Sequence, residues 1–187
     1  MRAIYCALLH HPVKDRAGDT VTTAVTTLDV HDIARSARTY ALRGYFVVSP
    51  IEAQHALIGR ILEHWESGAG RRRMPERGQA LAICRPLHSL EDVCGWVREQ
   101  EGQTPELWAT AARPPVGKTL VGFEDGRGRL ALDGPPVVLL FGTGHGLADD
   151  LLRAADVLLS PIAGRDGYNH LSVRSAAAIV FDRLLGA

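Results

Sequence analysis

The sequence predicts an α/β protein whose largely parallel sheet is covered by helices on both faces. Short apolar segments, typical of buried strands, alternate with longer segments of helical periodicity. The apolar run at 137–141 is the clearest strand of the chain. The chain has 187 residues, of which 46% are hydrophobic, so it is long enough to bury a substantial core. We therefore expect a single domain over residues 1–187.

The remaining elements follow from the same apolar patterns and from their end signals. We expect further strands at 3–9, 45–48, 80–84, 107–110 and 157–160, and helices at 29–42, 51–65, 90–99, 148–154 and 171–185. Asp29 or Asp32 is expected to cap the first helix and Gly44 to end it, and Ser89 is expected to cap the third.

One Gly- and Pro-rich stretch, residues 111–136, leaves two structures open. Segments 119–123 and 129–132 flank Asp125-Gly126, a pair of residues that favours a tight hairpin turn. A mobile connector explains the same composition. The local pattern does not decide between the two.

Charge and cysteine usage exclude several classes of protein. The 21 basic residues balance the 21 acidic ones, which counts against a strongly electrostatic nucleic-acid binder but permits a local basic patch. The three cysteines and eight histidines show no metal-binding spacing, so we expect no metal. No apolar run approaches the roughly 20 residues that a membrane span needs. We expect a cytoplasmic protein with reduced thiols and no membrane association.

The most informative stretch runs from residue 158 to residue 179. A buried strand leads into Pro161-Ile-Ala-Gly164, then into Tyr168-Asn-His-Leu-Ser-Val-Arg-Ser175, and a helix begins with small residues. A loop that closes around a ligand needs glycine and accessible backbone groups, and a helix that packs closely on it needs Ser and Ala. A loop and helix packed only for stability explain the three polar residues 168–170 poorly, so we favour a ligand site.

A second glycine-rich turn, Phe141-Gly-Thr-Gly-His-Gly-Leu147, follows the strand at 137–141. Its G-x-G-x-G spacing differs from the dinucleotide fingerprint, because Leu147 stands where the third glycine would fall and no acidic residue follows at the usual distance. The chain also has no P-loop Gly-Lys-Ser/Thr. A tight turn without a ligand remains the alternative for this segment alone. Both turns, however, follow neighbouring predicted strands, at the edge of an open α/β sheet where ligands bind.

Together the Phe-Gly-Thr-Gly and Tyr-Asn-His-Leu-Ser-Val-Arg-Ser motifs resemble those of SPOUT methyltransferases, which modify RNA with S-adenosylmethionine as cofactor. The resemblance implies a trefoil knot in the C-terminal half, with the cofactor-binding knot over about 105–187. Three loops of that knot would hold the cofactor, the first of them at 110–113. The residues that the resemblance assigns to the cofactor are Thr110, Ala111, Phe141, Gly142, Thr143, Gly144, Pro161, Ile162, Gly164, His170, Leu171 and Ser175.

The same resemblance suggests the residues that act on the RNA. Arg35, in Ile-Ala-Arg-Ser-Ala, matches the arginine of an early SPOUT helix motif, although the Asn–Gly part of that motif is missing here. Arg35 would position a phosphate or the target nucleotide, and Asn169 and Ser172 would shape the acceptor side. Asp29 or Asp32 is the candidate general base if the acceptor needs one.

The resemblance implies an RNA substrate, transfer or ribosomal, and a homodimer. The last helix has small and apolar faces that suit both core and dimer contacts. The basic groups Arg35 with Arg38, and Arg71–Arg73 with Arg77, are either solvated surfaces or RNA phosphate contacts. Two alternatives from other classes remain: a catalytically silent module that binds RNA or S-adenosylmethionine, and a dinucleotide-dependent oxidoreductase.

Overall fold

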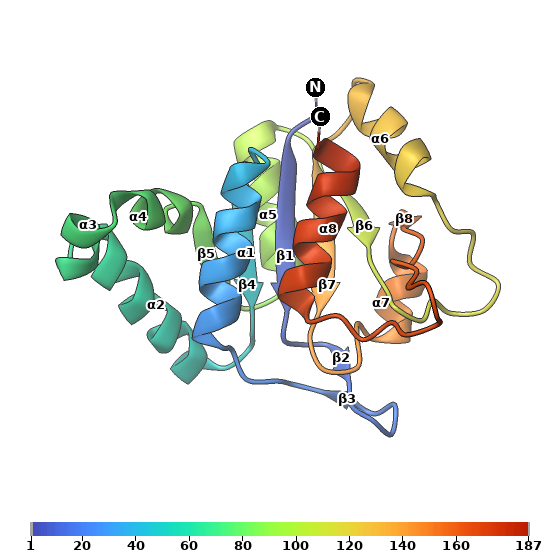
Figure 1. The fold of residues 1–187 in the computed structure, drawn as a ribbon, viewed down its shortest axis with the longest axis horizontal. Coiled ribbons are helices and arrows are strands. Elements are labelled where there is room, and N and C mark those ends of the chain that lie inside the picture. The colour runs from blue at the N-terminus through green and yellow to red at the C-terminus, as the bar shows by residue number, and fades with distance from the viewer. Residues whose placement is uncertain (1, 187) are drawn as a thin grey trace.

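The computed structural model describes residues 2–186 and contains a six-stranded parallel sheet in the order β5-β4-β1-β7-β6-β8 (Figure 1). Every pairing within this sheet is parallel. The strands are β1 (Ile4–Leu9), β4 (Gly44–Val48), β5 (Cys84–Leu87), β6 (Glu106–Ala109), β7 (Val137–Gly142) and β8 (Val157–Leu158). The central strands are apolar throughout, as strands covered on both faces should be.

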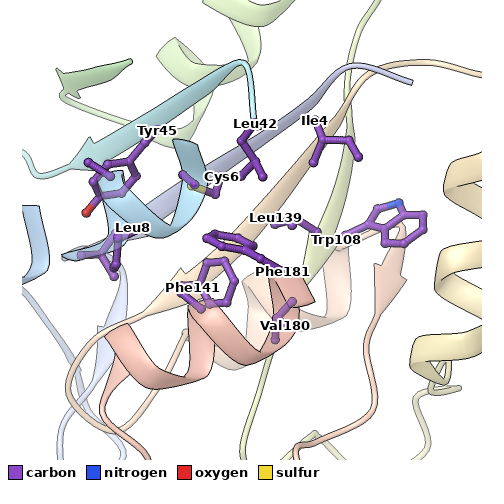
Figure 2. Packing of buried hydrophobic residues seen from close by; sticks show 14 of the residues in the cluster. Ile4, Cys6, Leu8, Leu42, Tyr45, Trp108, Leu139, Phe141, Val180 and Phe181 are labelled. Carbon is purple, nitrogen blue, oxygen red and sulfur yellow. The ribbon is translucent and has the colours of Figure 1, made fainter. Parts of the chain in front are cut away.

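Helices cover both faces of the sheet and define two apolar cores. One face carries α1 (Thr27–Thr39), α2 (Glu52–Glu66), α4 (Pro75–Leu81), α6 (Phe123–Ala131) and α8 (Val173–Leu185), with α3 (Ala69–Arg73) joining α2 to α4. The other face carries α5 (Leu90–Glu101) and α7 (Asp149–Ala154). In the first core, Phe181 of α8 meets Phe141 of β7 edge-to-face at 5.6 Å (Figure 2).

The carboxyl-terminal chain crosses from one face of the sheet to the other. It runs between β6 and Val121: the Leu159 amide donates to the Ala109 carbonyl at 3.0 Å, and the Val121 amide donates to the Leu158 carbonyl at 2.9 Å. Before this crossing α7 packs on one face, and after it α8 packs on the other. The chain therefore passes through the loop closed by residues 110–122, α6 and β7. The predicted C-terminal knot requires this path.

Two expectations about the first helix are wrong in detail. The helix begins at Thr27, because the hydroxyl of Thr26 accepts the Asp29 amide and caps it, so neither Asp29 nor Asp32 is the cap. The helix ends at Thr39, and Ala41 adopts a φ of 57°. Gly44 instead opens β4, where a Cβ would lie 2.9 Å from the Tyr5 ring.

Several other elements differ from the prediction. Residues 80–84 are not a strand, because α4 ends at Leu81 and β5 begins at Cys84. Neither a hairpin nor a mobile connector describes all of 111–136, since residues 123–131 form α6. No sequence pattern indicated α3 or the small antiparallel pair β2 (Val13–Lys14) and β3 (Thr20–Val21). Among residues 2–186, no helix has the length and apolar character that crossing a membrane requires.

Candidate functional site

A cavity of about 1080 Å³ lies at the carboxyl edge of the sheet. Four chain segments line it, and each leaves that edge: residues 14–26 after β1, and the loops after β6, β7 and β8. The first turns of α1 and α8 close its floor with Asp29, Val173 and Arg174. A volume of this size matches ordinary small-molecule sites.

The glycines of the turn after β7 allow the chain to approach itself closely. A Cβ on Gly142 would lie 2.6 Å from the Leu147 amide nitrogen. Gly144 has a φ of 60°, and a Cβ there would lie 2.9 Å from the Lys14 carbonyl oxygen. The turn is joined to β2 by the Lys14 amide, which donates to the Gly146 carbonyl at 2.8 Å. These glycines therefore shape the cavity by fixing residues 14–26 against the β7 turn.

The loop after β8 is compact and contacts the loop after β6. A Cβ on Gly164 would lie 2.1 Å from the Tyr168 carbonyl oxygen, so glycine is required at this fold-back. The Asn169 side-chain amide donates to the Ala112 carbonyl at 3.4 Å. Ser172 caps α8, since its hydroxyl accepts the Ser175 amide at 3.2 Å. α8 consequently begins at Val173, two residues later than predicted.

An ion pair between α1 and α8 lines the cavity. Arg174 Nη1 donates to Asp29 Oδ1 at 2.7 Å, and Arg174 Nε lies 3.6 Å from Asp32 Oδ2. The hydroxyl of Thr26 donates to the other Asp29 oxygen at 2.6 Å. Both carboxylate oxygens of the buried Asp29 are thus occupied, which suits it to holding Arg174 in place rather than to removing a proton.

A buried histidine supports the cavity wall from behind. His10 follows β1, is fully buried, and shares a 3.0 Å hydrogen bond between its Nδ1 and the hydroxyl of Thr23. The Thr23 hydroxyl is bonded in turn to that of Thr143 in the β7 turn. Burial lowers the pKa of His10 from 6.5 to about 4, with Asp29 opposing the shift, so His10 is neutral at pH 7.

Most of the residues predicted for the site line this one cavity. They are Thr110, Ala111, Phe141, Gly142, Thr143, Gly144, Pro161, Ile162, Asn169, His170, Leu171 and Ser172. Three others do not line it. Gly164 allows the loop after β8 to fold back on itself, and the Ser175 amide donates to the hydroxyl of Ser172 that caps α8. Arg35 lies on the exposed surface of α1, 3.9 Å from Asp32.

Sequence reasoning missed several lining residues. Arg174 belongs to the Ser-Val-Arg-Ser motif, so its position in the segment was visible, but its pairing with Asp29 depends on contact between α1 and α8. Lys14, Arg16 and Thr23 line the cavity because β2 and β3 fold over it, and no local pattern predicted those short strands. Among residues 2–186, no group of His, Cys, Asp and Glu has the arrangement of a metal site.

The fold and this cavity define a class of α/β enzymes with the ligand site at the carboxyl edge of a parallel sheet. Comparison with known proteins identifies the family: a family model described as SAM-dependent RNA methyltransferase matches residues 3–186, and the chain belongs to that family. S-adenosylmethionine is therefore the methyl donor and RNA the acceptor in its class, and the prediction of the class is confirmed.

The chain is also similar to individual relatives and, in its fold, to a solved structure. The chain is 46% identical over 185 residues to a tRNA (guanine-N(1)-)-methyltransferase of Oleidesulfovibrio alaskensis, covering 99% of this chain and 42% of that protein. It is 38% identical over 181 residues to an uncharacterized protein of Aquifex aeolicus, covering 97% and 87%. A TrmH/SpoU tRNA modifying enzyme of A. aeolicus has a similar fold, with a TM-score of 0.57 at 12% identity, covering 99% and 75%. The predicted SPOUT fold is thus confirmed.

The chain spans about 42% of the length of the tRNA (guanine-N(1)-)-methyltransferases that it matches. The matched segment is therefore less than half of each of these proteins.

Proposed function

We propose that this chain transfers a methyl group from S-adenosylmethionine to RNA in the cavity at the carboxyl edge of the sheet. The observation that carries the proposal is the convergence there of the loops after β6, β7 and β8, which the SPOUT resemblance had assigned to the cofactor. Ligands bind at this edge in open α/β sheets generally.

The lining suits such a donor. Apolar side chains, among them Phe141, Ile162 and Leu171, can cover an adenine ring, and the backbone of the β6 and β7 loops offers donors and acceptors to its edge and to the ribose. When bound, the cofactor supplies an electrophilic methyl group on a good leaving group. The chain's contribution is then mainly to hold donor and acceptor in line.

Arg174 is the best-placed cation for the acceptor side. Asp29 and Asp32 hold its Nη1 and Nε, which leaves the second terminal nitrogen, Nη2, for a phosphate or a base oxygen. Asn169 and Ser172, proposed for the acceptor side from the sequence, lie in the same cavity wall. We assign Arg35 to phosphate contact outside the cavity.

We further propose tRNA as the RNA class, a homodimer as the active form, and action in the cytoplasm. The names of the two curated relatives support tRNA. The α1–α8 side supports a dimer, because these helices pack side by side and Leu28 is exposed near the amino end of α1. Sedimentation at several concentrations tests the dimer, and a constant monomer mass would reject it.

Calorimetry with S-adenosylmethionine, followed by transfer of labelled methyl groups to unmodified tRNA and rRNA transcripts, tests the function. We expect binding with one site per chain and label incorporation into tRNA. Binding without incorporation into either RNA would indicate the silent module instead. Absence of binding would reject the proposal.

A further inference from the structure

The α3 helix presents three consecutive arginines, Arg71–Arg73, at the surface of the molecule. All three are exposed, and among residues 2–186 their only polar contact is from Arg71 Nη1 to the Glu66 carbonyl at 3.2 Å. α2, α3 and α4 project from the body of the protein on the side where α1 lies (Figure 1). The positive charge of α3 is thus available to a partner.

This projection is held firmly to α1 through Trp65. A Cβ on Gly70 would lie 2.7 Å from the Trp65 ring, so α3 packs as closely as a glycine allows. The Arg77 guanidinium stacks over the same ring at 4.9 Å, and His31 of α1 meets it edge-on at 5.6 Å. Rigid support lowers the entropy cost of binding a ligand on this surface.

Charged contacts lead from the cavity onto α1. Arg174 lies 3.6 Å from Asp32, and Asp32 lies 3.9 Å from Arg35. Burial lowers the pKa of His31, and the neighbouring Arg77 lowers it further, with Asp32 opposing the shift. α1 also packs against α4, which contacts α3, so the projection with the three arginines continues from this helix.

We infer that Arg35 and Arg71–Arg73 form a phosphate-binding track for the RNA whose target nucleotide enters the cavity; this inference rests on the proposed function. Arginine suits the task because its planar fork matches phosphate and is weakly hydrated. The formal net charge of the chain is zero, so attraction of RNA must come from such local surfaces rather than from the whole molecule.

The double variant Arg72→Ala with Arg73→Ala tests the track, because neither side chain has a polar partner among residues 2–186 to lose. Its matched control is Arg98→Ala with Arg129→Ala. These exposed arginines lie in the last turns of α5 and α6. The two helices lead into β6 and β7 at the amino edge of the sheet, away from the cavity. The probe is a fluorescein-labelled unmodified tRNA transcript, and its anisotropy is followed between about 50 and 200 mM salt.

Loss of two phosphate contacts should lower the slope of log K against log salt by about 1.4 to 1.8 and weaken binding at least about tenfold near 0.1 M salt. The control variant should match the unchanged protein, and both variants should bind S-adenosylmethionine normally. If the track variant keeps the original slope while methyl transfer persists, the track is rejected and the function stands. If the unchanged protein neither binds nor methylates RNA, both are rejected.

Discussion

Arg174 is the residue on which we expect RNA methylation to depend most. Arg174→Ala removes the cavity cation that Asp29 holds and leaves the buried Asp29 without its ion-pair partner. We expect kcat on RNA to fall at least about a hundredfold, as for other lost transition-state contacts. Affinity for S-adenosylmethionine should change only a few-fold. Single-turnover methylation and calorimetry separate the two effects.

The same variant should also lower the free energy of unfolding by about 1–3 kcal/mol, since breaking a partly buried pair leaves an unpaired charge. Adding Asp29→Asn should restore much of this stability but none of the activity. A double variant that regains methylation would show that Arg174 acts only through folding.

His10 gives the protein an acid-sensitive contribution to stability. Its pKa is about 4 in the folded protein and about 6.5 when unfolded, so the unfolded chain takes up the proton first. Stability is therefore lost as pH falls from about 6.5 to about 4, by up to about 3 kcal/mol. His10→Gln should flatten this part of the stability curve, measured by urea unfolding across that pH range.

The neighbouring His11, which is exposed, supplies the control. His11→Gln should keep the acid slope of the unchanged protein. If the His10 variant loses stability with falling pH as steeply as the control does, another group is responsible.

Gly144 and Gly146 provide a matched test of the β7 turn. Both have positive φ angles, 60° and 102°, so alanine at either costs roughly 1–2 kcal/mol in backbone strain. Only the Gly144 Cβ meets another group within 4 Å, the Lys14 carbonyl among them. We expect Gly144→Ala to weaken S-adenosylmethionine binding at least tenfold more than Gly146→Ala. If calorimetry gives the two variants equal affinities for S-adenosylmethionine, the close approach of Gly144 to Lys14 does not matter for binding.

At the scale of elements, α3 depends on the close fit of Gly70 against Trp65. Gly70→Ala should destabilise the protein by about 1–3 kcal/mol, because a methyl group would overlap the ring. Gly59→Ala, on α2 with open space around its Cβ, should be neutral or slightly stabilising. Thermal unfolding measures both. A neutral Gly70→Ala would show that α3 is held loosely.

The strands were predictable because most are short runs of apolar residues. Five of them, and the helices at 51–65, 90–99, 148–154 and 171–185, are confirmed within a few residues. The helix at 123–131 was not predicted, because Asp125-Gly126 favours a turn locally. In the structure Gly126 lies inside α6, where a Cβ would come 2.9 Å from Leu184 of α8. Gly126 allows α6 to pack closely against α8, and no local sequence pattern reveals such a tertiary contact.

The candidate site was predictable to the extent that it follows strands. Loops after parallel strands meet at one edge, so the residues near 110, 143 and 162 could be grouped from the amino-acid sequence alone. The pairing of Arg174 with Asp29 could not, because α1 and α8 are 145 residues apart at this contact. The resemblance pointed to Arg35 on the same helix as Asp29, less than two turns beyond it.

For the molecule as a whole we expect one cooperative unfolding transition. The two cores lie on opposite faces of strands that they share, so neither can melt while the other keeps its sheet. Trp108 reports on one core and Trp96 packs against the other. Urea curves from fluorescence of single-Trp variants and from far-UV circular dichroism should coincide. Separate midpoints would contradict the predicted single domain.

The passage of the chain between β6 and Val121 constrains how a fusion to this protein can be made. A small tag after Gly186 can follow α8 through the ring of residues 110–142. A bulky folded module attached there cannot pass through this ring. The ring must instead close around the chain before the module folds. Refolding of such a fusion from denaturant should therefore be far slower than that of one carrying the module at the amino end.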